Sequence, residues 1–374
     1  MAVVSTNLWK KLPRPIVGLA PMNGVTDHAF RQIQKRYGCP DVVMTEFTPV
    51  DGICAGADAL LKDLLYDEAQ RPILAQVYGS VPEEFHTAAV ILCQLGFDGI
   101  DVNMGCPSRA VASRGSGAAL IRTPGLAQQI IRATKRGVAD WMNGRTVRDC
   151  LTIPGQFAEQ VEAQHRRLPE PYRQHRGIPV SVKTRTGYDR PVVQEWIPAL
   201  LECSPDAIGI HGRTLSQGYS GEANWDHIGH AAELAAGSGC SILGNGDVRS
   251  WEDAQDKAQS FQVAGALIGR ASYGNPHVFR PAGVPESTEA GGGQRKPHSY
   301  RILEIAMEHA RLYEESFSRL PGYHFLPMRK HLSWYAKHVP SASYLRRALA
   351  QTSSVEEAEA VIKEYLEYRR GWND

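Results

Sequence analysis

The sequence predicts an α/β fold with a parallel sheet, followed by a small helical domain. Eight short apolar runs recur between Ile16 and Arg270, and the segments between them are long enough for a helix. The runs are continuously apolar and not alternating, which is typical of parallel strands covered on both faces. Eight strand–helix units over this length fit a closed (β/α)8 TIM barrel better than an open sheet.

The expected strands lie at residues 16–20, 42–45, 73–77, 99–103, 180–183, 207–211, 241–245 and 266–270. The fourth is followed by Gly105-Cys106-Pro107, which cannot continue a strand because Pro has no N–H for the ladder. A thiol therefore follows the carboxyl end of a strand, where parallel barrels place their chemistry. Taken alone, Cys106 is equally compatible with a small buried hydrophobic residue.

Composition divides the 374 residues into three parts. We assign residues 1–283 to the barrel, residues 284–297, rich in Pro, Gly, Ser and Glu, to a linker, and residues 298–374 to the helical domain. The spacing before the fifth strand is too wide for one helix, so residues 137–177 are interpreted as an insertion with a helix at 158–167. An insertion that precedes a strand lies towards the amino-terminal face of the barrel, so we expect a packing or partner role for it.

The bulk composition, 43% hydrophobic and 22% charged, is that of a globular protein with a sizeable core. Seven cysteines without a Cys-x-x-Cys pair argue against a disulfide framework and a structural zinc site. No apolar run approaches membrane-spanning length. We therefore expect a cytoplasmic monomer without a metal or a membrane anchor.

A net charge of +1 means that nucleic-acid binding would need a local basic patch. Residues 316–354 contain no Asp or Glu but carry several cations, with aromatic residues between them. The aromatic residues Trp334 and Tyr335 have a second explanation, because they are equally suited to the core of the helical domain.

Residues suited to ligand binding, most of them polar, stand at the carboxyl end of nearly every expected strand. In chain order they are Pro21 and Met22, Gln76, Asn103 and Cys106, Lys183 and Arg185, His211, Asn245-Gly246-Asp247, and Gly269-Arg270. Each alone has a structural explanation: Lys183 as a surface cation, for example, or His211 as a core histidine. Together they predict a single site at the barrel mouth.

The composition of that site favours a phosphorylated flavin. The ends of strands seven and eight form the usual phosphate site of such barrels, and Arg270 adds a bidentate clamp. Gln76 can pair with the edge of a heterocycle, while Lys183 can stabilise the reduced, anionic flavin ring. No Gly-x-Gly-x-x-Gly follows the first strand, so we predict FMN and not a dinucleotide.

Several of these segments, taken together, resemble the tRNA-dihydrouridine synthase family. The matching segments are residues 20–22, 25–27, 45–47, 103–107, 182–187, 211–214, 218–219, 245–247 and 268–270. They occur in the family's order between residues 15 and 280, and the helical tail is also similar. The resemblance implies a flavin barrel with a helical tRNA-binding domain. In it, NADPH reduces FMN, and the reduced FMN then reduces the C5–C6 bond of a uracil in tRNA.

The resemblance also implies roles for individual residues. Cys106 is expected to protonate C5 while flavin N5 gives hydride to C6, a role that suits a thiol with a pKa near about 8.5. Contacts to the uracil are expected from Asn103, Arg185 and Tyr219. Contacts to FMN are expected from Pro21, Met22, Gln76, Lys183, His211, Asn245, Gly246, Asp247, Gly269 and Arg270.

The uracil must leave the tRNA stack to reach the flavin, and cations on the surface help to offset that cost. Our candidates for the tRNA backbone are Arg109, Arg114, Arg329, Lys330, Arg346 and Arg347. The family often carries a lysine where Ala110 stands here, so it is open whether Arg109 or Arg114 replaces it.

Two other functions are compatible with parts of this pattern. An FMN-dependent reductase of a free pyrimidine, such as a dihydroorotate or dihydropyrimidine dehydrogenase, shares the lysine and the phosphate site but does not explain the helical tail. A non-catalytic tRNA-binding chaperone explains the tail but not the retention of Cys106 and Lys183.

Overall fold

The computed structural model describes residues 7–57, 62–283, 298–340 and 342–370. Its strands are β1 (Ile16–Leu19), β2 (Val43–Met44), β3 (Thr48–Pro49), β4 (Ile73–Tyr78), β5 (Gly99–Met104), β6 (Val180–Arg185), β7 (Ala207–His211), β8 (Ser241–Asn245) and β9 (Gly265–Ile268). They pair in parallel in the order β1-β9-β8-β7-β6-β5-β4-β2, with the short β3 also on β4. Backbone hydrogen bonds of 2.9 Å from Leu19 N to Val42 O and from Asp41 N to Val17 O join the two ends of this order. The predicted barrel is confirmed, and β3 is an addition to the predicted strands.

Apart from α1, which precedes β1, the helices of the barrel region follow the strands. They are α1 (Leu8–Lys11), α2 (His28–Ile33), α3 (Val50–Cys54), α4 (Pro82–Gln94), α5 (Arg109–Ala112), α6 (Pro124–Met142), α7 (Gly155–Arg167), α8 (Glu170–Arg173), α9 (Val193–Leu201), α10 (Asp226–Leu234) and α11 (Trp251–Ser260). Local sequence explains several starts: Asp27 caps α2, Ser250 caps α11, and α4 begins with a proline. All six residues of β5 are buried, as expected for a strand covered on both faces.

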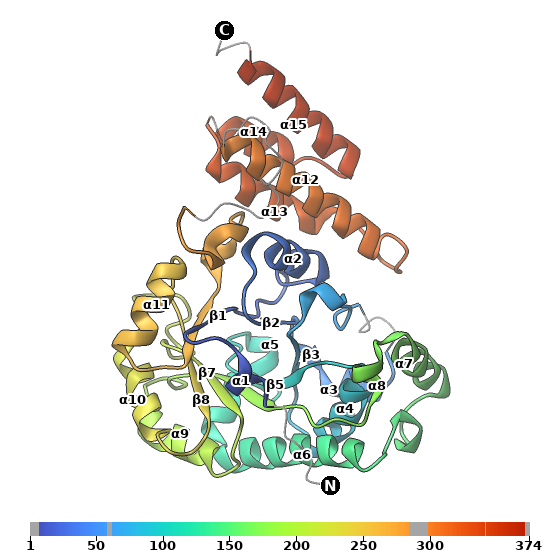
Figure 1. Ribbon diagram of the computed structural model, residues 1–374, viewed down its shortest axis with the longest axis vertical. Coiled ribbons are helices and arrows are strands. Elements are labelled where there is room, and N and C mark those ends of the chain that lie inside the picture. The colour runs from blue at the N-terminus through green and yellow to red at the C-terminus, as the bar shows by residue number, and fades with distance from the viewer. Residues whose placement is uncertain (1–6, 58–61, 284–297, 341, 371–374) are drawn as a thin grey trace.

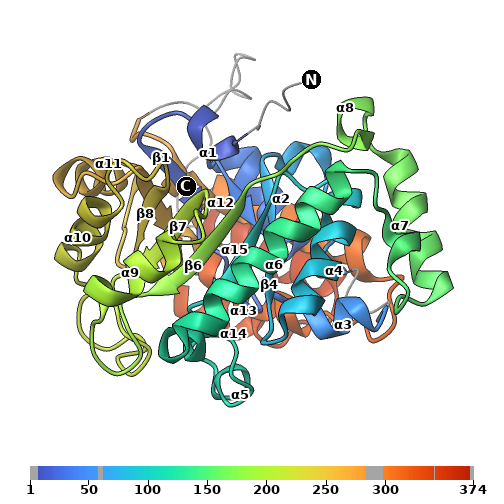
Figure 2. The ribbon, with the colours of Figure 1, turned by 90° about the horizontal axis from the view of Figure 1, so that it is seen from below.

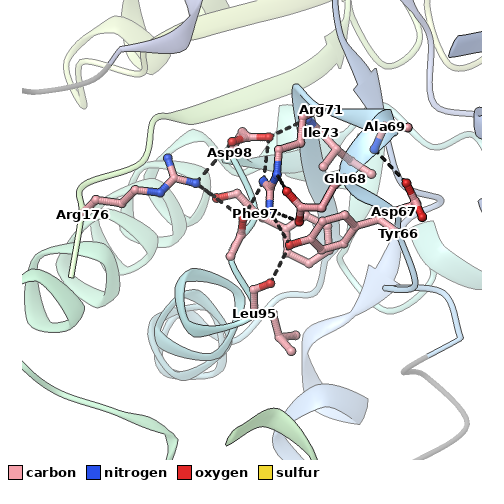
Figure 3. A network of polar contacts seen from close by, with 11 residues as sticks. Tyr66, Asp67, Glu68, Ala69, Arg71, Ile73, Leu95, Phe97, Asp98 and Arg176 are labelled. Atoms are coloured by element: carbon pink, nitrogen blue, oxygen red, sulfur yellow. Dashed lines mark hydrogen bonds and ion pairs between the residues drawn. The ribbon is translucent and has the colours of Figure 1, made fainter. Parts of the chain in front are cut away.

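The segment interpreted as an insertion contains α7 and α8, and its end is tied to the amino-terminal face of the barrel (Figure 3). Arg176 donates to Phe97 O at 2.9 Å and pairs with Asp98 at 3.2 Å. Asp98 also pairs with Arg71 at 3.1 Å and accepts the N–H of Ile73 at 3.0 Å. Because Arg71, Asp98 and Arg176 precede β4, β5 and β6, this network lies opposite the strand ends with the predicted chemistry.

The carboxyl-terminal region forms a second helical unit (Figure 1), comprising α12 (His298–Phe317), α13 (Leu326–Tyr335), α14 (Ala342–Leu349) and α15 (Val355–Arg370). Its hydrophobic core also includes Ala29 and Ile33 of α2, so the barrel contributes one helix to it. Seen from below, the helical unit lies behind the barrel helices α4 and α6 (Figure 2). The predicted linker, residues 284–297, lies outside the described residues.

Within the described part of the chain, no helix combines the length and apolar character needed to cross a membrane.

Candidate active site

A cavity of about 930 Å³ opens at the carboxyl ends of the strands. Every residue predicted to be catalytic or to bind cofactor or uracil lines it: Pro21, Met22, Gln76, Asn103, Cys106, Lys183, Arg185, His211, Tyr219, Asn245, Gly246, Asp247, Gly269 and Arg270. The strands bring these residues together because parallel strands of a barrel all end on the same face. Their individual roles stay predictions.

The loop after β5 is organised by Asn103. Its side-chain oxygen accepts the N–H groups of Gly105 at 3.1 Å and Cys106 at 2.9 Å, and its amide nitrogen donates to Gln76 Oε1 at 2.9 Å. Gln76 in turn donates to Asp101 Oδ2 at 2.7 Å, and Asp101 accepts from Ser181 at 2.7 Å. Each of the two amide nitrogens has a second hydrogen that can be offered to a ligand.

Cys106 is 8% exposed at the edge of the cavity. Burial raises the pKa of its thiol above the ordinary value, and a hydrogen bond from the backbone of Ser108 and the charge of Arg185 only partly oppose this. The thiol is therefore protonated at neutral pH. This suits a proton donor and does not suit a thiolate nucleophile.

Lys183 projects from β6 into the barrel, where its ammonium donates to Asn245 Oδ1 at 2.9 Å. Gly209 on the neighbouring strand makes room for it, since a Cβ there would lie 2.9 Å from Lys183 Cδ. Burial lowers the pKa of Lys183 to about 8, the charge of Arg185 adds to this effect, and Asp101 opposes it. The amine remains mostly protonated at neutral pH and has two further hydrogens for an anionic ligand.

Arg185 is buried beneath the same cavity. Its guanidinium donates to Gly105 O at 2.7 Å and to Thr214 O at 3.0 Å, and so joins the loops after β5 and β7. Tyr219, in contrast, is 62% exposed. The ring of Tyr219 therefore lies largely exposed at the rim of the cavity.

The predicted phosphate side is arranged around Asp247, which adopts a left-handed conformation with a φ of 51°. Its carboxylate pairs with Arg213 at 2.6 Å and with Arg270 at 2.9 Å, and Arg270 also lies over the ring of Tyr219 at 4.9 Å. Burial and these cations, with Lys183 and Arg185, lower the pKa of His211 to about 2. The imidazole is thus neutral and able to act as a hydrogen-bond partner.

These residues fit FMN by the chemistry of their donors. Lys183 and the two amides of Gln76 and Asn103 supply unused hydrogens for a polar ring, while Arg270 supplies a cation near the ends of β8 and β9. Gly246 keeps that corner open, since a Cβ there would lie 2.6 Å from Ala223 and 2.9 Å from the ring of His211.

The six cations predicted for the tRNA backbone do not line this cavity. Arg109 begins α5, but its side chain lies outside the described residues, while Arg114 and Arg347 are exposed. Arg329 donates to Thr352 O at 2.7 Å, Lys330 donates to Gly24 O, and the half-buried Arg346 donates to Ala342 O at 3.3 Å. Contact with RNA stays a prediction for all six.

Several residues of the site were given no role from the sequence, although Phe47 and Arg213 lie in segments that resemble the family. They are Phe47, Tyr78, Arg249 and Tyr273, which line the cavity, and Asp101 and Arg213, which support it from behind. A charged residue inside an apolar run marks Asp101, and the two-residue strand period places Tyr78 on the same face as Gln76. Tyr273 carries no such signal, because it lies beyond the last strand.

Fold and site together define a parallel (β/α)8 barrel with a polar, cation-lined cavity at its mouth and a helical domain beside it. A model of the family described as "Dihydrouridine synthase (Dus)" matches residues 18–149 and 150–369. The probable tRNA-dihydrouridine synthase 2 of Bacillus subtilis (strain 168) is 30% identical over 368 residues, covering 97% of either chain. The probable tRNA-dihydrouridine synthase of Staphylococcus aureus (strain COL) is 30% identical over 366 residues, covering 96% of this chain and 95% of the relative. The chain belongs to the dihydrouridine synthase family, which confirms the family predicted from the strand-end motifs.

Proposed function

We propose that this protein reduces the C5–C6 bond of specific uridines in tRNA to 5,6-dihydrouridine, with FMN as cofactor and NADPH as reductant. The observation that carries the proposal is that one cavity, in a chain of this family, collects all the residues predicted for the chemistry. FMN, once reduced by NADPH, would supply the hydride that adds to C6.

The residues of the chain divide the remaining tasks. Cys106 holds a proton at neutral pH and delivers it to C5. Asn103 fixes the loop that carries this thiol and offers its remaining N–H to a uracil carbonyl, while Arg185 and the exposed ring of Tyr219 contact the base. Lys183 supplies a cation that would stabilise the negative charge of the reduced flavin.

The helical domain and the cations around the barrel mouth bind the tRNA backbone, which helps to offset the cost of unstacking the target uridine. A cytoplasmic monomer is the state we propose.

The test is a reconstitution with unmodified tRNA. Purified protein is mixed with FMN, NADPH and tRNA from a strain lacking the protein, and the nucleosides are analysed by mass spectrometry for a gain of two hydrogens per modified uridine. Dihydrouridine at defined positions, formed only when both FMN and NADPH are present, supports the proposal. Reduction of free uracil without tRNA would instead indicate a free-pyrimidine reductase, and a protein that binds tRNA but no flavin would indicate a chaperone.

A further inference from the structure

One face of α13 contacts two separate loops of the barrel. Lys330 donates a hydrogen bond to the carbonyl of Gly24, in the loop after β1. Trp334 stacks on Tyr273, in the loop after β9, with ring centroids 3.9 Å apart and an interplanar angle of 8°. Residues four apart lie on the same face of a helix, so a single turn of α13 spans both loops. One helical turn is long enough to reach both loops because β1 and β9 are neighbours in the barrel.

Both loops are walls of the candidate active site. Met22 and Asn23 line the cavity from the first loop, and Arg270 and Tyr273 line it from the second. Pro21 and Met22 on the first loop, and Gly269 and Arg270 on the second, are among the residues predicted to contact FMN.

Contact with the second loop includes the backbone as well as the ring. Gly274 has a φ of 67°, and a Cβ at this position would lie 2.4 Å from the carbonyl carbon of Trp334 and 2.6 Å from Tyr335 N. Trp334 itself packs against the hydrophobic core of the barrel, whereas Leu332 and Tyr335 belong to the core of the helical domain. Helix α13 therefore belongs to both cores.

The first loop is held from two sides. Within the barrel, Val25 N donates to Glu46 at 2.8 Å, and from the helical domain Lys330 donates to Gly24. Lys330 and Glu46, with Asp27, also line a smaller cavity of about 230 Å³ between the two domains. The ammonium of Lys330 thus has partners inside the protein, although the sequence placed it among the cations for RNA.

We propose that Lys330 and Trp334 are positioning residues, which hold the loops after β1 and β9 in the geometry that binds FMN. The inference rests on the proposed function. The helical domain then determines the affinity of the barrel for its flavin, in addition to any contact it makes with tRNA.

The experiment measures FMN affinity in the full chain without using activity. Flavin-free protein is titrated into FMN, and binding is followed by the loss of flavin fluorescence and by the visible spectrum of the bound flavin. Trp334→Leu and Lys330→Met each raise the Kd for FMN about threefold to tenfold, as the loss of a stacked pair or of one charge-assisted hydrogen bond implies. The conservative variants Trp334→Phe and Lys330→Arg restore most of the affinity. At saturating FMN, the KM for tRNA is unchanged.

Matched controls come from α14 and α15. Tyr344→Leu and, on the neighbouring helix α15, Lys363→Met remove an exposed aromatic residue and an exposed cation of the same domain, and both keep the wild-type Kd for FMN.

Two results would overturn the inference. In the first, Trp334→Leu and Lys330→Met bind FMN as the wild type does. A rise in the KM for tRNA would then identify the two residues as RNA contacts, and an unchanged KM would show that they affect neither ligand. In the second, Trp334→Phe and Lys330→Arg lose as much affinity as the drastic variants. A wild-type chain that binds no FMN would be a different failure, because it removes the proposed function itself.

Discussion

The side-chain oxygen of Asn103 accepts the backbone N–H of Cys106 at 2.9 Å, so the last residues of β5 fix the start of the loop that carries the thiol. The same side chain donates to Gln76 at 2.9 Å on the neighbouring strand. A single amide thus links the predicted proton donor to a predicted flavin contact.

Replacing Asn103 by Ala is expected to leave the N–H of Cys106 and the side-chain oxygen of Gln76 without their partner. Unsatisfied buried groups cost about 1–3 kcal/mol, so the free energy of unfolding falls by that amount in urea titrations. The rate of dihydrouridine formation falls further than the FMN affinity, because the thiol loses its position. The same substitution at the exposed Asn143 is the control, and equal effects at both sites would contradict the assignment.

Replacing Cys106 by Ala is expected to keep bound FMN and NADPH oxidation but to reduce dihydrouridine formation by a factor of about 10²–10⁴, the usual contribution of a general acid. Because burial raises the pKa of this thiol, wild-type activity should persist through neutral pH and decline only on the alkaline side. Cys39→Ser, at an exposed position, serves as the control. Modification of tRNA by the alanine variant at the wild-type rate would show that the proton comes from elsewhere.

Lys183 is expected to make the stability of the flavin-free protein depend on alkaline pH. Burial lowers its pKa to about 8 in the folded chain, against an ordinary value of 10.5. Between these values the unfolded chain binds more protons, so this residue makes the folded state more stable as pH rises, by about 3 kcal/mol in total. Chemical unfolding at pH 7.5 and pH 10 should reveal this gain in the wild type and not in Lys183→Met, which also binds FMN more weakly. The same pH dependence of stability in both proteins would show that Lys183 is not its source.

His309 should make stability depend on acid pH. Burial lowers its pKa to about 3 in the folded protein, against an ordinary value of 6.5. Below pH 6.5 this imidazole therefore binds a proton in the unfolded chain but stays neutral in the folded chain. Between pH 7.5 and pH 5, this residue costs the folded state about 2 kcal/mol. His309→Leu should remove that part of the acid sensitivity in urea titrations, with His324→Leu, at an exposed position, as the control. An unchanged acid sensitivity in His309→Leu would show that this imidazole titrates normally.

Reversing Arg346 and Arg347 to Glu is expected to weaken tRNA binding and to reduce the slope of log K against log salt by about 1–2, with FMN still bound. The adjacent pair Arg166 and Arg167 on α7 is the matched control, since both are exposed on a helix whose end reaches the opposite face of the barrel. Filter binding of labelled tRNA at several salt concentrations measures the effect. Equal losses of tRNA affinity from the two pairs would mean that the cations of residues 316–354 have no special role in tRNA binding.

The barrel and the residues that line its cavity could be predicted from the sequence, because both follow from the order of the strands along the chain. Eight apolar runs define eight parallel strands, and the residue after each run lies on the same face whatever the helices between them do. Gln76, Asn103, Lys183 and Asn245 were therefore correctly brought to one cavity without knowledge of a single contact.

Partner choice within the site could not be predicted in this way. Asp247 pairs with both Arg213 and Arg270, and the amide nitrogen of Asn103 donates to Gln76. Side-chain geometry across neighbouring strands decides which donors meet which acceptors. Chain order alone leaves these pairings open.

The sequence by itself therefore determined the fold class, the family and the set of residues at the barrel mouth, since strand order places them there. Only the tertiary structure decided which loops of the barrel mouth the helical domain contacts. Lys330 reaches Gly24 across 306 positions of the chain, and Trp334 finds Tyr273 across the predicted linker. Such contacts depend on how two hydrophobic cores pack against α2 and α13, which no local pattern encodes. A cation that the sequence assigned to RNA binding is thereby placed against a loop that lines the candidate active site.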